Sequence, residues 1–218
     1  MSKKLIQGIT LSSLIGIFIF GIGVHKNIIK FPIQKTIEVQ YAADFSDDKI
    51  LMGSSHHVFV GKVIKKAGTK DAGMDPETQF EVEVIHNIKG NLQGNVIVEQ
   101  AGGYINGVLY LVHGGDVVLP QESANRVPNA DSLFVPGSTY LFATRYNKEE
   151  DWHTSLSHPN AKKLISANKN LTFEQLKLLA EKDVRVIQLK EAYKSEIPFE
   201  IDVKSGNQLN SYSSLQAG

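Results

Sequence analysis

The chain has 218 residues, in which 23 lysines and arginines balance 23 aspartates and glutamates, and it contains no cysteine. The lack of cysteine excludes disulfide bonds and thiolate metal sites. The near-neutral charge argues against a nucleic-acid partner, which would require a basic face. The length suits one globular domain with extensions.

The first predicted element is an uncharged, mostly apolar run over residues 5–24, from Leu5 to Val24, preceded by Lys3 and Lys4. About 20 apolar residues, each rising 1.5 Å, cross a hydrocarbon core of roughly 30 Å. The run is longer than the roughly 7–15 apolar residues of a cleaved signal peptide, and no good cleavage site follows it. We therefore predict a membrane anchor over residues 1–25, with the membrane as partner. The alternative is secretion after signal cleavage.

Residues 26–45 are predicted to form a juxtamembrane spacer, because they mix isoleucine and lysine with a single proline. Lysines lie on both sides of the anchor, so the positive-inside rule does not fix its orientation. After the spacer, Ser46 can cap a short helix over residues 47–53.

Two strands are predicted in the next part of the chain. Residues 57–65 are apolar on both faces, which is typical of a strand covered on both sides or closed into a barrel. Gly61 in its middle indicates a bulge or a close backbone approach. Residues 67–77 contain glycines and a proline and are expected to form a loop. Residues 78–84 alternate between apolar and polar, and the alternation breaks at Ile85.

Further short strands are predicted at residues 96–100, 104–113, 138–146 and 151–156. Turn residues separate them. Gly102 and Gly103 are expected to end the first of these, and Asn106-Gly107 is a strong hairpin signal. Residues 116–129 are expected to form a loop. Five or six short strands with glycine breaks favour a small, closed, OB-like β-barrel over residues 46–165.

The periodicity becomes helical after residue 170. Thr172 and Gln175 fit a capping box at a helix start, and a second helix is expected over residues 184–193. Residues 166–197 are thus a predicted helical appendix that packs on the barrel, and residues 198–218 a flexible tail. Four apolar side chains are expected to be buried in this packing: Leu176, Leu179, Ile187 and Leu189.

The expected fold class is therefore mainly β, and α+β overall. It comprises an N-terminal transmembrane helix, the OB-like barrel and a C-terminal helical pair.

Three short motifs in the barrel region are shared with a known family: Val58-Phe59-Val60-Gly61-Lys62-Val63, Gln100-x-Gly102-Gly103 and Pro136-Gly137-x-x-Tyr140-Leu141-Phe142. Over residues 44–163 the chain resembles the netrin-like domains related to tissue inhibitors of metalloproteinases. It looks closer still to the uncharacterised exported versions of that domain in Gram-positive bacteria. The resemblance implies an OB-type fold and an exported location. The inhibitors act through a free N-terminal cysteine and disulfides, so metalloproteinase inhibition does not carry over.

The sequence contains no recognisable catalytic motif. Serines do not occur in a Gly-x-Ser-x-Gly pattern, and the histidines lack metal-site spacing, so we assign no catalytic residue, metal or cofactor. His56 and His57 are adjacent and would point to opposite faces of a strand. Four residues are weak binding candidates on a barrel face: Tyr104, Tyr110, Trp152 and His153. The alternative is that most of the aromatic residues belong to the core.

Two functional hypotheses follow. The first is a membrane-anchored extracytoplasmic binding module without evident catalysis, whose ligand or protein partner is unknown. The second is a cell-surface hydrolase that uses histidine and acidic residues. Convergence of three histidines and an acid in a pocket would favour the second hypothesis.

If residues 5–24 form an uncleaved anchor, the full-length protein should remain in the membrane fraction after alkaline carbonate extraction. A peripheral membrane protein should be released by the same treatment. Recovery of a soluble fragment that begins near Val24 or later would instead demonstrate a cleaved signal.

Overall fold

The computed structural model describes residues 34–39, 43–71, 76–106, 108–114 and 132–199. Within these ranges, no helix has both the length and the apolar character that a membrane span requires. The anchor predicted at residues 5–24 lies outside them, as do the loop expected at 116–129 and the tail from residue 200 onwards.

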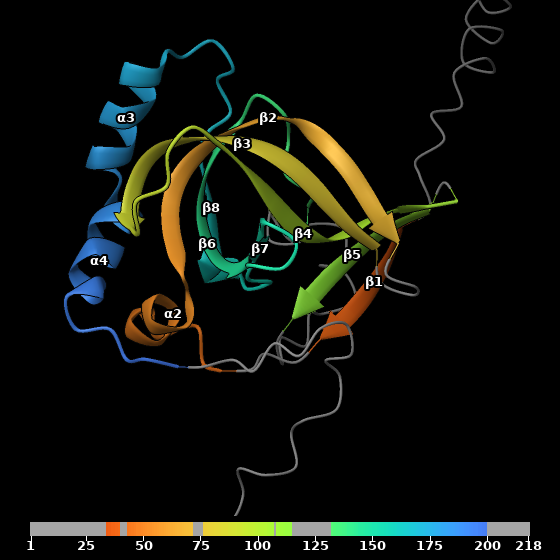
Figure 1. Cartoon of the computed structure of the whole chain (residues 1–218), viewed down its shortest axis with the longest axis horizontal. Helices are drawn as coiled ribbons and strands as arrows, with labels where there is room; N and C mark the ends of the chain where they lie inside the picture. The colour runs from red at the N-terminus through yellow and green to blue at the C-terminus, as the bar shows by residue number, and fades with distance from the viewer. Residues whose placement is uncertain (1–33, 40–42, 72–75, 107, 115–131, 200–218) are drawn as a thin grey trace, which may run out of the picture. The chain divides into compact units, whose positions relative to one another are not determined.

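Eight strands and three helices make up the described part of the chain. In order they are β1 (Gln34–Val39), α2 (Asp48–Ser54), β2 (His57–Asp71), β3 (Pro76–Lys89), β4 (Asn95–Ile105), β5 (Val108–Gly114), β6 (Thr139–Asn147), β7 (Trp152–Ser155), β8 (Lys162–Ser166), α3 (Phe173–Lys182) and α4 (Val184–Tyr193) (Figure 1).

Five of the strands close into a barrel in the order β4-β3-β2-β6-β7, and β7 pairs back onto β4. All of these pairings are antiparallel except the closing one, which is parallel. β8 adds to β6, while β5 pairs with the end of β4 and β1 pairs with β5. The prediction of a mainly β chain with a small β-barrel is confirmed.

The loop predicted at residues 67–77 is wrong for residues 67–71 and 76–77, which belong to the paired strands β2 and β3, while residues 72–75 lie outside the described residues. Thr69 pairs with Thr78, and Lys70 pairs with Glu77. Gly68, one of the residues that suggested a loop, lies at a register irregularity of the β2–β3 pair. Such bulges increase the local twist of a strand, which helps a long hairpin to bend around a small barrel.

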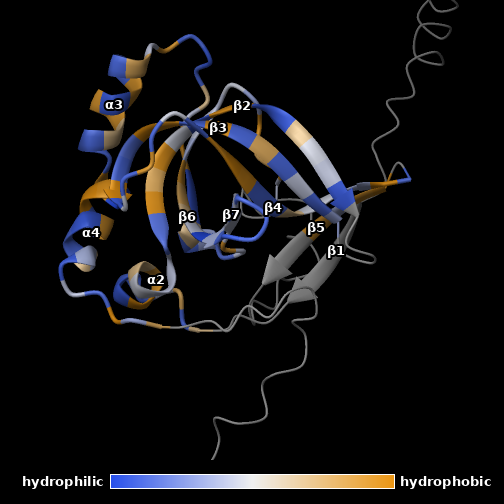
Figure 2. Cartoon of the chain, viewed as in Figure 1, coloured by the Kyte–Doolittle hydropathy of each residue, from blue (hydrophilic) through white to orange (hydrophobic). Residues whose placement is uncertain are grey.

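Both faces of β2 are buried, as its sequence predicted. Phe59 and Val63 belong to the apolar cluster that fills the barrel, while Val58 and Val60 belong to a second cluster shared with the helices. The alternating bands of β2 and β3 are visible in Figure 2. The expected constraint at Gly61 is also confirmed, because a Cβ atom there would lie 2.5 Å from a methyl group of Val82.

β3 passes from one cluster to the other at the predicted break in alternation. Phe80, Val82 and Val84 point into the barrel cluster, and Ile85 joins the helix-side cluster. Since two consecutive side chains are buried on opposite faces, this stretch of β3 connects the barrel interior to the helices.

Gly102 and Gly103 do not end β4, which runs on to Ile105. A Cβ atom at Gly102 would lie 2.9 Å from the carbonyl oxygen of Tyr110, and one at Gly103 would lie 2.7 Å from Thr78 Oγ1. The two glycines therefore allow close approach of neighbouring segments within a continuous strand.

The helix starts follow local capping. α2 begins one residue later than predicted, because Asp47 rather than Ser46 accepts the capping hydrogen bond, from the backbone N–H of Lys49. The capping box of Thr172 and Gln175 is present at the start of α3, and α4 has the predicted bounds. The sequence did not predict β8.

The helical pair packs on the barrel, but through a narrower stripe than predicted. Leu176 and Leu189 are buried in the helix-side cluster, whereas Leu179 is 42% exposed and Ile187 is 53% exposed. Ala180 and Val186 occupy the remaining buried positions. A small alanine thus sits where the prediction placed a leucine.

Replacing Leu176 by alanine should destabilise the protein by about 2–5 kcal/mol, because it leaves a cavity in a packed cluster. Leu179→Ala, on the same helix, should change the free energy of unfolding by less than about 0.5 kcal/mol. Urea unfolding of both variants checks this. Equal losses would show that α3 docks through a different face.

Candidate ligand-binding site

The four binding candidates are distributed over the β4–β5 hairpin and β7. Tyr104 is 47% exposed and Tyr110 is half-buried, one on each strand of the hairpin. Trp152 and His153 are consecutive on β7, so their side chains point to opposite faces of the strand. His153 is buried toward the barrel interior, near the ring of Phe59, whereas Trp152 is half-buried on the other face.

Three histidines and an acid do gather around the inner face of β7. The ring of His153 lies 4.9 Å from that of His57 and 5.0 Å from that of Tyr146, measured between ring centroids. The Tyr146 hydroxyl donates a hydrogen bond of 2.7 Å to Asp151, and its backbone N–H donates one of 3.0 Å to His56 Nδ1.

Burial lowers the pKa values of two of these imidazoles. It lowers the pKa of His153 to about 4, with a further contribution from the nearby His57 ring. Burial likewise lowers the pKa of His57, assisted by His56 and Lys89. His57 Nδ1 and His153 Nδ1 are buried without a hydrogen-bond partner in the described part of the chain.

The histidine cluster is packed into the barrel wall and is not arranged for metal chemistry. His153 is only 4% exposed, so a substrate would reach it only if a strand moved. Across the described ranges, no group of three histidine or acidic side chains is placed to hold a metal ion.

The outer face of β7 carries a second polar cluster, which includes a carboxyl that sequence reasoning missed. Glu99 is 3% exposed, and its Oε2 accepts a 3.3 Å hydrogen bond from the Thr154 hydroxyl. Burial, and then the carboxyl of Glu77 in contact with it, raise the pKa of Glu99 to about 7. Lys70 Nζ lies 4.4 Å from the ring centroid of Trp152. Alternation marks Glu99 as outward-facing, but the strand register, which pairs Glu99 with Gln79 and Glu77 with Ala101, is needed to place Glu77 diagonally across from it.

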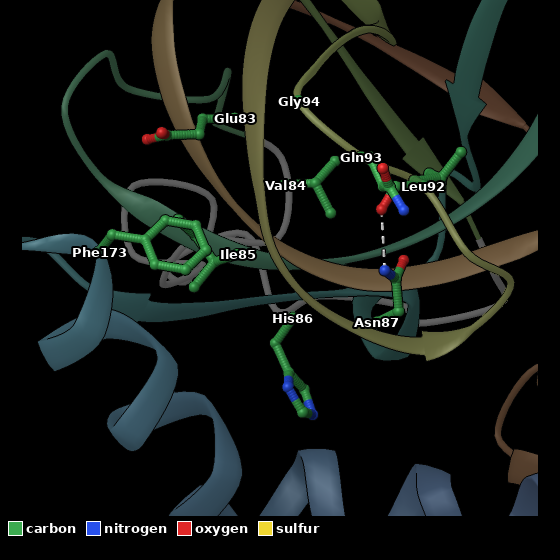
Figure 3. A pocket seen from close by; sticks show the side chains of 9 residues that line it. All are labelled: Glu83, Val84, Ile85, His86, Asn87, Leu92, Gln93, Gly94 and Phe173. Carbon is green, nitrogen blue, oxygen red and sulfur yellow. Dashed lines mark hydrogen bonds between the residues drawn. The ribbon is translucent and has the colours of Figure 1, made fainter.

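A pocket of about 360 Å³ lies beside β3, away from both clusters of β7. It is lined by residues 83–87 of β3, residues 92–94 of the turn to β4, and Phe173 at the start of α3. Figure 3 shows these side chains, with Phe173 entering from the helix and His86 pointing toward the helical pair.

The pocket combines an apolar wall with polar atoms that have no partner. Phe173 is 43% exposed, and Leu92 is half-buried on the turn. Asn87 Nδ2 donates a 2.9 Å hydrogen bond to the carbonyl of Leu92, but Asn87 Oδ1 is buried without a donor among the described residues. His86 Nε2 is likewise buried without a partner there.

His86 is also kept neutral. Burial lowers its pKa most, and the charge of Lys190 lowers it further, while Glu181 acts in the opposite sense.

Sequence reasoning did not assign this pocket. The only hint in the sequence was the break in alternation at Ile85. There Val84 is buried in the barrel cluster and Ile85 in the helix-side cluster, so the strand passes from one to the other. That Phe173 of α3, distant in sequence, lines this pocket is evident only from the three-dimensional structure.

No family model matches the chain, and no curated protein matches it at a significant level.

Proposed function

We propose that this protein is a membrane-anchored, extracytoplasmic binding module whose ligand site is the pocket beside β3. The observation that carries the proposal is a ligand-sized hollow of about 360 Å³ between β3, the turn to β4 and the exposed ring of Phe173 at the start of α3. Ligand sites are typically concave and largely apolar, with a few polar groups that fix the orientation of the ligand.

The pocket favours a small ligand group with mixed character. Its volume of about 360 Å³ is near the lower end of the range of roughly 300–1,000 Å³ that is typical of ligand sites. An aromatic or branched apolar group would pack against Phe173 and Leu92. The side chain of a peptide or a small amide fits this description.

The barrel and the sequence motifs support the wider proposal. Five-stranded barrels are the architecture of OB-type domains, which bind their ligands on the barrel surface and in adjoining loops. The resemblance to netrin-like domains and the long apolar run at residues 5–24 support export and anchoring. The whole assignment of location rests on these sequence features.

The hydrolase alternative has one observation in its favour, the gathering of three histidines and Asp151 around Tyr146. General acid or base catalysis requires the catalytic group to reach the substrate. His153 is enclosed in the wall at 4% exposure, and the pocket lies elsewhere. Binding is therefore the better-supported function.

A screen of small aromatic amides by NMR, with the full-length protein in lipid nanodiscs, tests the site. We expect weakly binding compounds to shift the methyl resonances of Val84, Ile85 and Leu92. Phe173→Ala should weaken this binding about tenfold or more, since it removes most of one wall. Leu178→Ala, an exposed leucine on the same helix outside the lining, is the matched control and should leave the affinity unchanged. Equal affinities for the two variants would contradict the site.

Protease treatment of intact cells with the wall removed tests the location. An exported domain should be digested to a small membrane-bound stub, because long domains translocate largely regardless of the flanking charges. A known surface protein serves as the positive control. Survival of the full-length chain until the cells are lysed would place the domain in the cytoplasm and remove the cell-surface interpretation.

A further inference from the structure

The barrel is closed by a very short parallel pairing. Only two residue pairs join β4 to β7, namely Val98 with His153 and Glu99 with Thr154. We refer to these four residues as the β4–β7 joint. By comparison, four pairs join β6 to β7 and six join β2 to β6.

The outer face of the joint contains two carboxyl groups in contact. Glu99 is 3% exposed and touches the carboxyl of the half-buried Glu77 from β3, so two negative charges there would repel each other with little water to screen them. The Thr154 hydroxyl satisfies one oxygen of Glu99 at 3.3 Å, and a proton held between the two carboxyls would satisfy the other.

Nearby cations do not neutralise this pair. Lys70, from β2, lies over the ring of Trp152 at 4.4 Å and forms an ion pair of 3.7 Å with Glu150 in the β6–β7 turn. It lowers the pKa of Glu99, but less than burial and Glu77 raise it.

The inner face of the joint contains a buried imidazole. His153 is 4% exposed and stacks edge-on against His57 of β2, with Tyr146 of β6 beside both rings. The nearest acid, Asp151, raises the pKa of His153, but burial, His57 and His56 together outweigh it. A charged imidazole at this place would therefore weaken the packing.

We propose that two groups at the β4–β7 joint make the closure of the barrel depend on pH, and that their effects oppose each other. A proton on Glu99, held beside the carboxyl of Glu77, stabilises the outer face of the joint, a neutral His153 stabilises its inner face, and a change in pH affects the two faces in opposite directions. Because the joint consists of only two residue pairs, either group alone could decide whether β7 stays paired with β4.

The two contributions have opposite signs. The pKa of Glu99 is raised from 4.5 to about 7, so its contribution to closure is fully present below pH 4.5 and is lost as pH rises through about 7. The pKa of His153 is lowered from 6.5 to about 4, so its contribution is fully present above pH 6.5 and is lost as pH falls through about 4. Between pH 4.5 and 6.5 the two changes oppose each other.

Amide hydrogen exchange of β7 in the full-length protein tests the proposal, with rates corrected for intrinsic pH dependence. We expect the protection of Glu99→Gln relative to the unmodified protein to rise with pH, by up to about tenfold per unit between pH 4.5 and 6.5. The relative protection of His153→Phe should fall over the same range. If relative protection changes with pH in opposite directions for the two variants, the proposal is supported. If it does not change, or changes in the same direction for both, the proposal is overturned.

Two further variants keep the test decisive. Glu77→Gln leaves Glu99 in place and should give a slope of the same sign as Glu99→Gln but smaller, even if Glu99→Gln folds poorly. If the relative protection of Glu77→Gln did not change with pH, Glu77 would have no part in holding the proton on Glu99. Glu149→Gln, in the exposed β6–β7 turn, is the matched control and should give no slope. A slope there as large as that of Glu99→Gln would overturn the assignment to Glu99.

Discussion

The closure of the barrel through β4 and β7 is the constraint on which the rest of the structure depends. Without it, the five strands would form an open sheet, and the aromatic side chains that fill the barrel would face water. Phe59, Phe80 and Phe142 are each at most 2% exposed, and Phe59 stacks on Phe142 with ring centroids 5.2 Å apart. Burying large rings of this kind is a principal source of stability in a small domain. The two residue pairs of the joint therefore maintain a core far larger than themselves.

The helices depend on the same closed wall from the other side. β2 contributes Phe59 and Val63 to the interior and Val58 and Val60 to the surface on which α3 and α4 dock. Isolated helices of ten residues are marginally stable in water, so the helical pair must gain its stability from packing on this surface. The pocket beside β3 forms where the wall turns from the interior to the helices, which is why both strand and helix residues line it.

Local patterns predicted the elements well, and tertiary features poorly. The capping box at Thr172 and the two apolar faces of residues 57–65 depend on neighbours in sequence, and both were read correctly. The loop expected at residues 67–77 was wrong for residues 67–71 and 76–77, because the ladder between β2 and β3 overrides the turn propensity of Gly68 and Pro76. The contact of Glu77 with Glu99, diagonally across β3 and β4, depends on register, and the contact of Phe173 with the pocket depends on docking. Sequence alternation shows on which face of the sheet a side chain lies, but not which residue of the adjacent strand lies beside it.

The parallel pairing of β4 and β7 can be observed directly by NMR at pH 6. If the barrel is closed as described, backbone protons of Val98 and Glu99 should show nuclear Overhauser contacts with those of His153 and Thr154, in parallel register. The contacts of β7 with β6 should be present in the same spectrum and serve as the internal reference. Contacts between β7 and β6 alone would contradict the account, because the five strands would then form an open sheet.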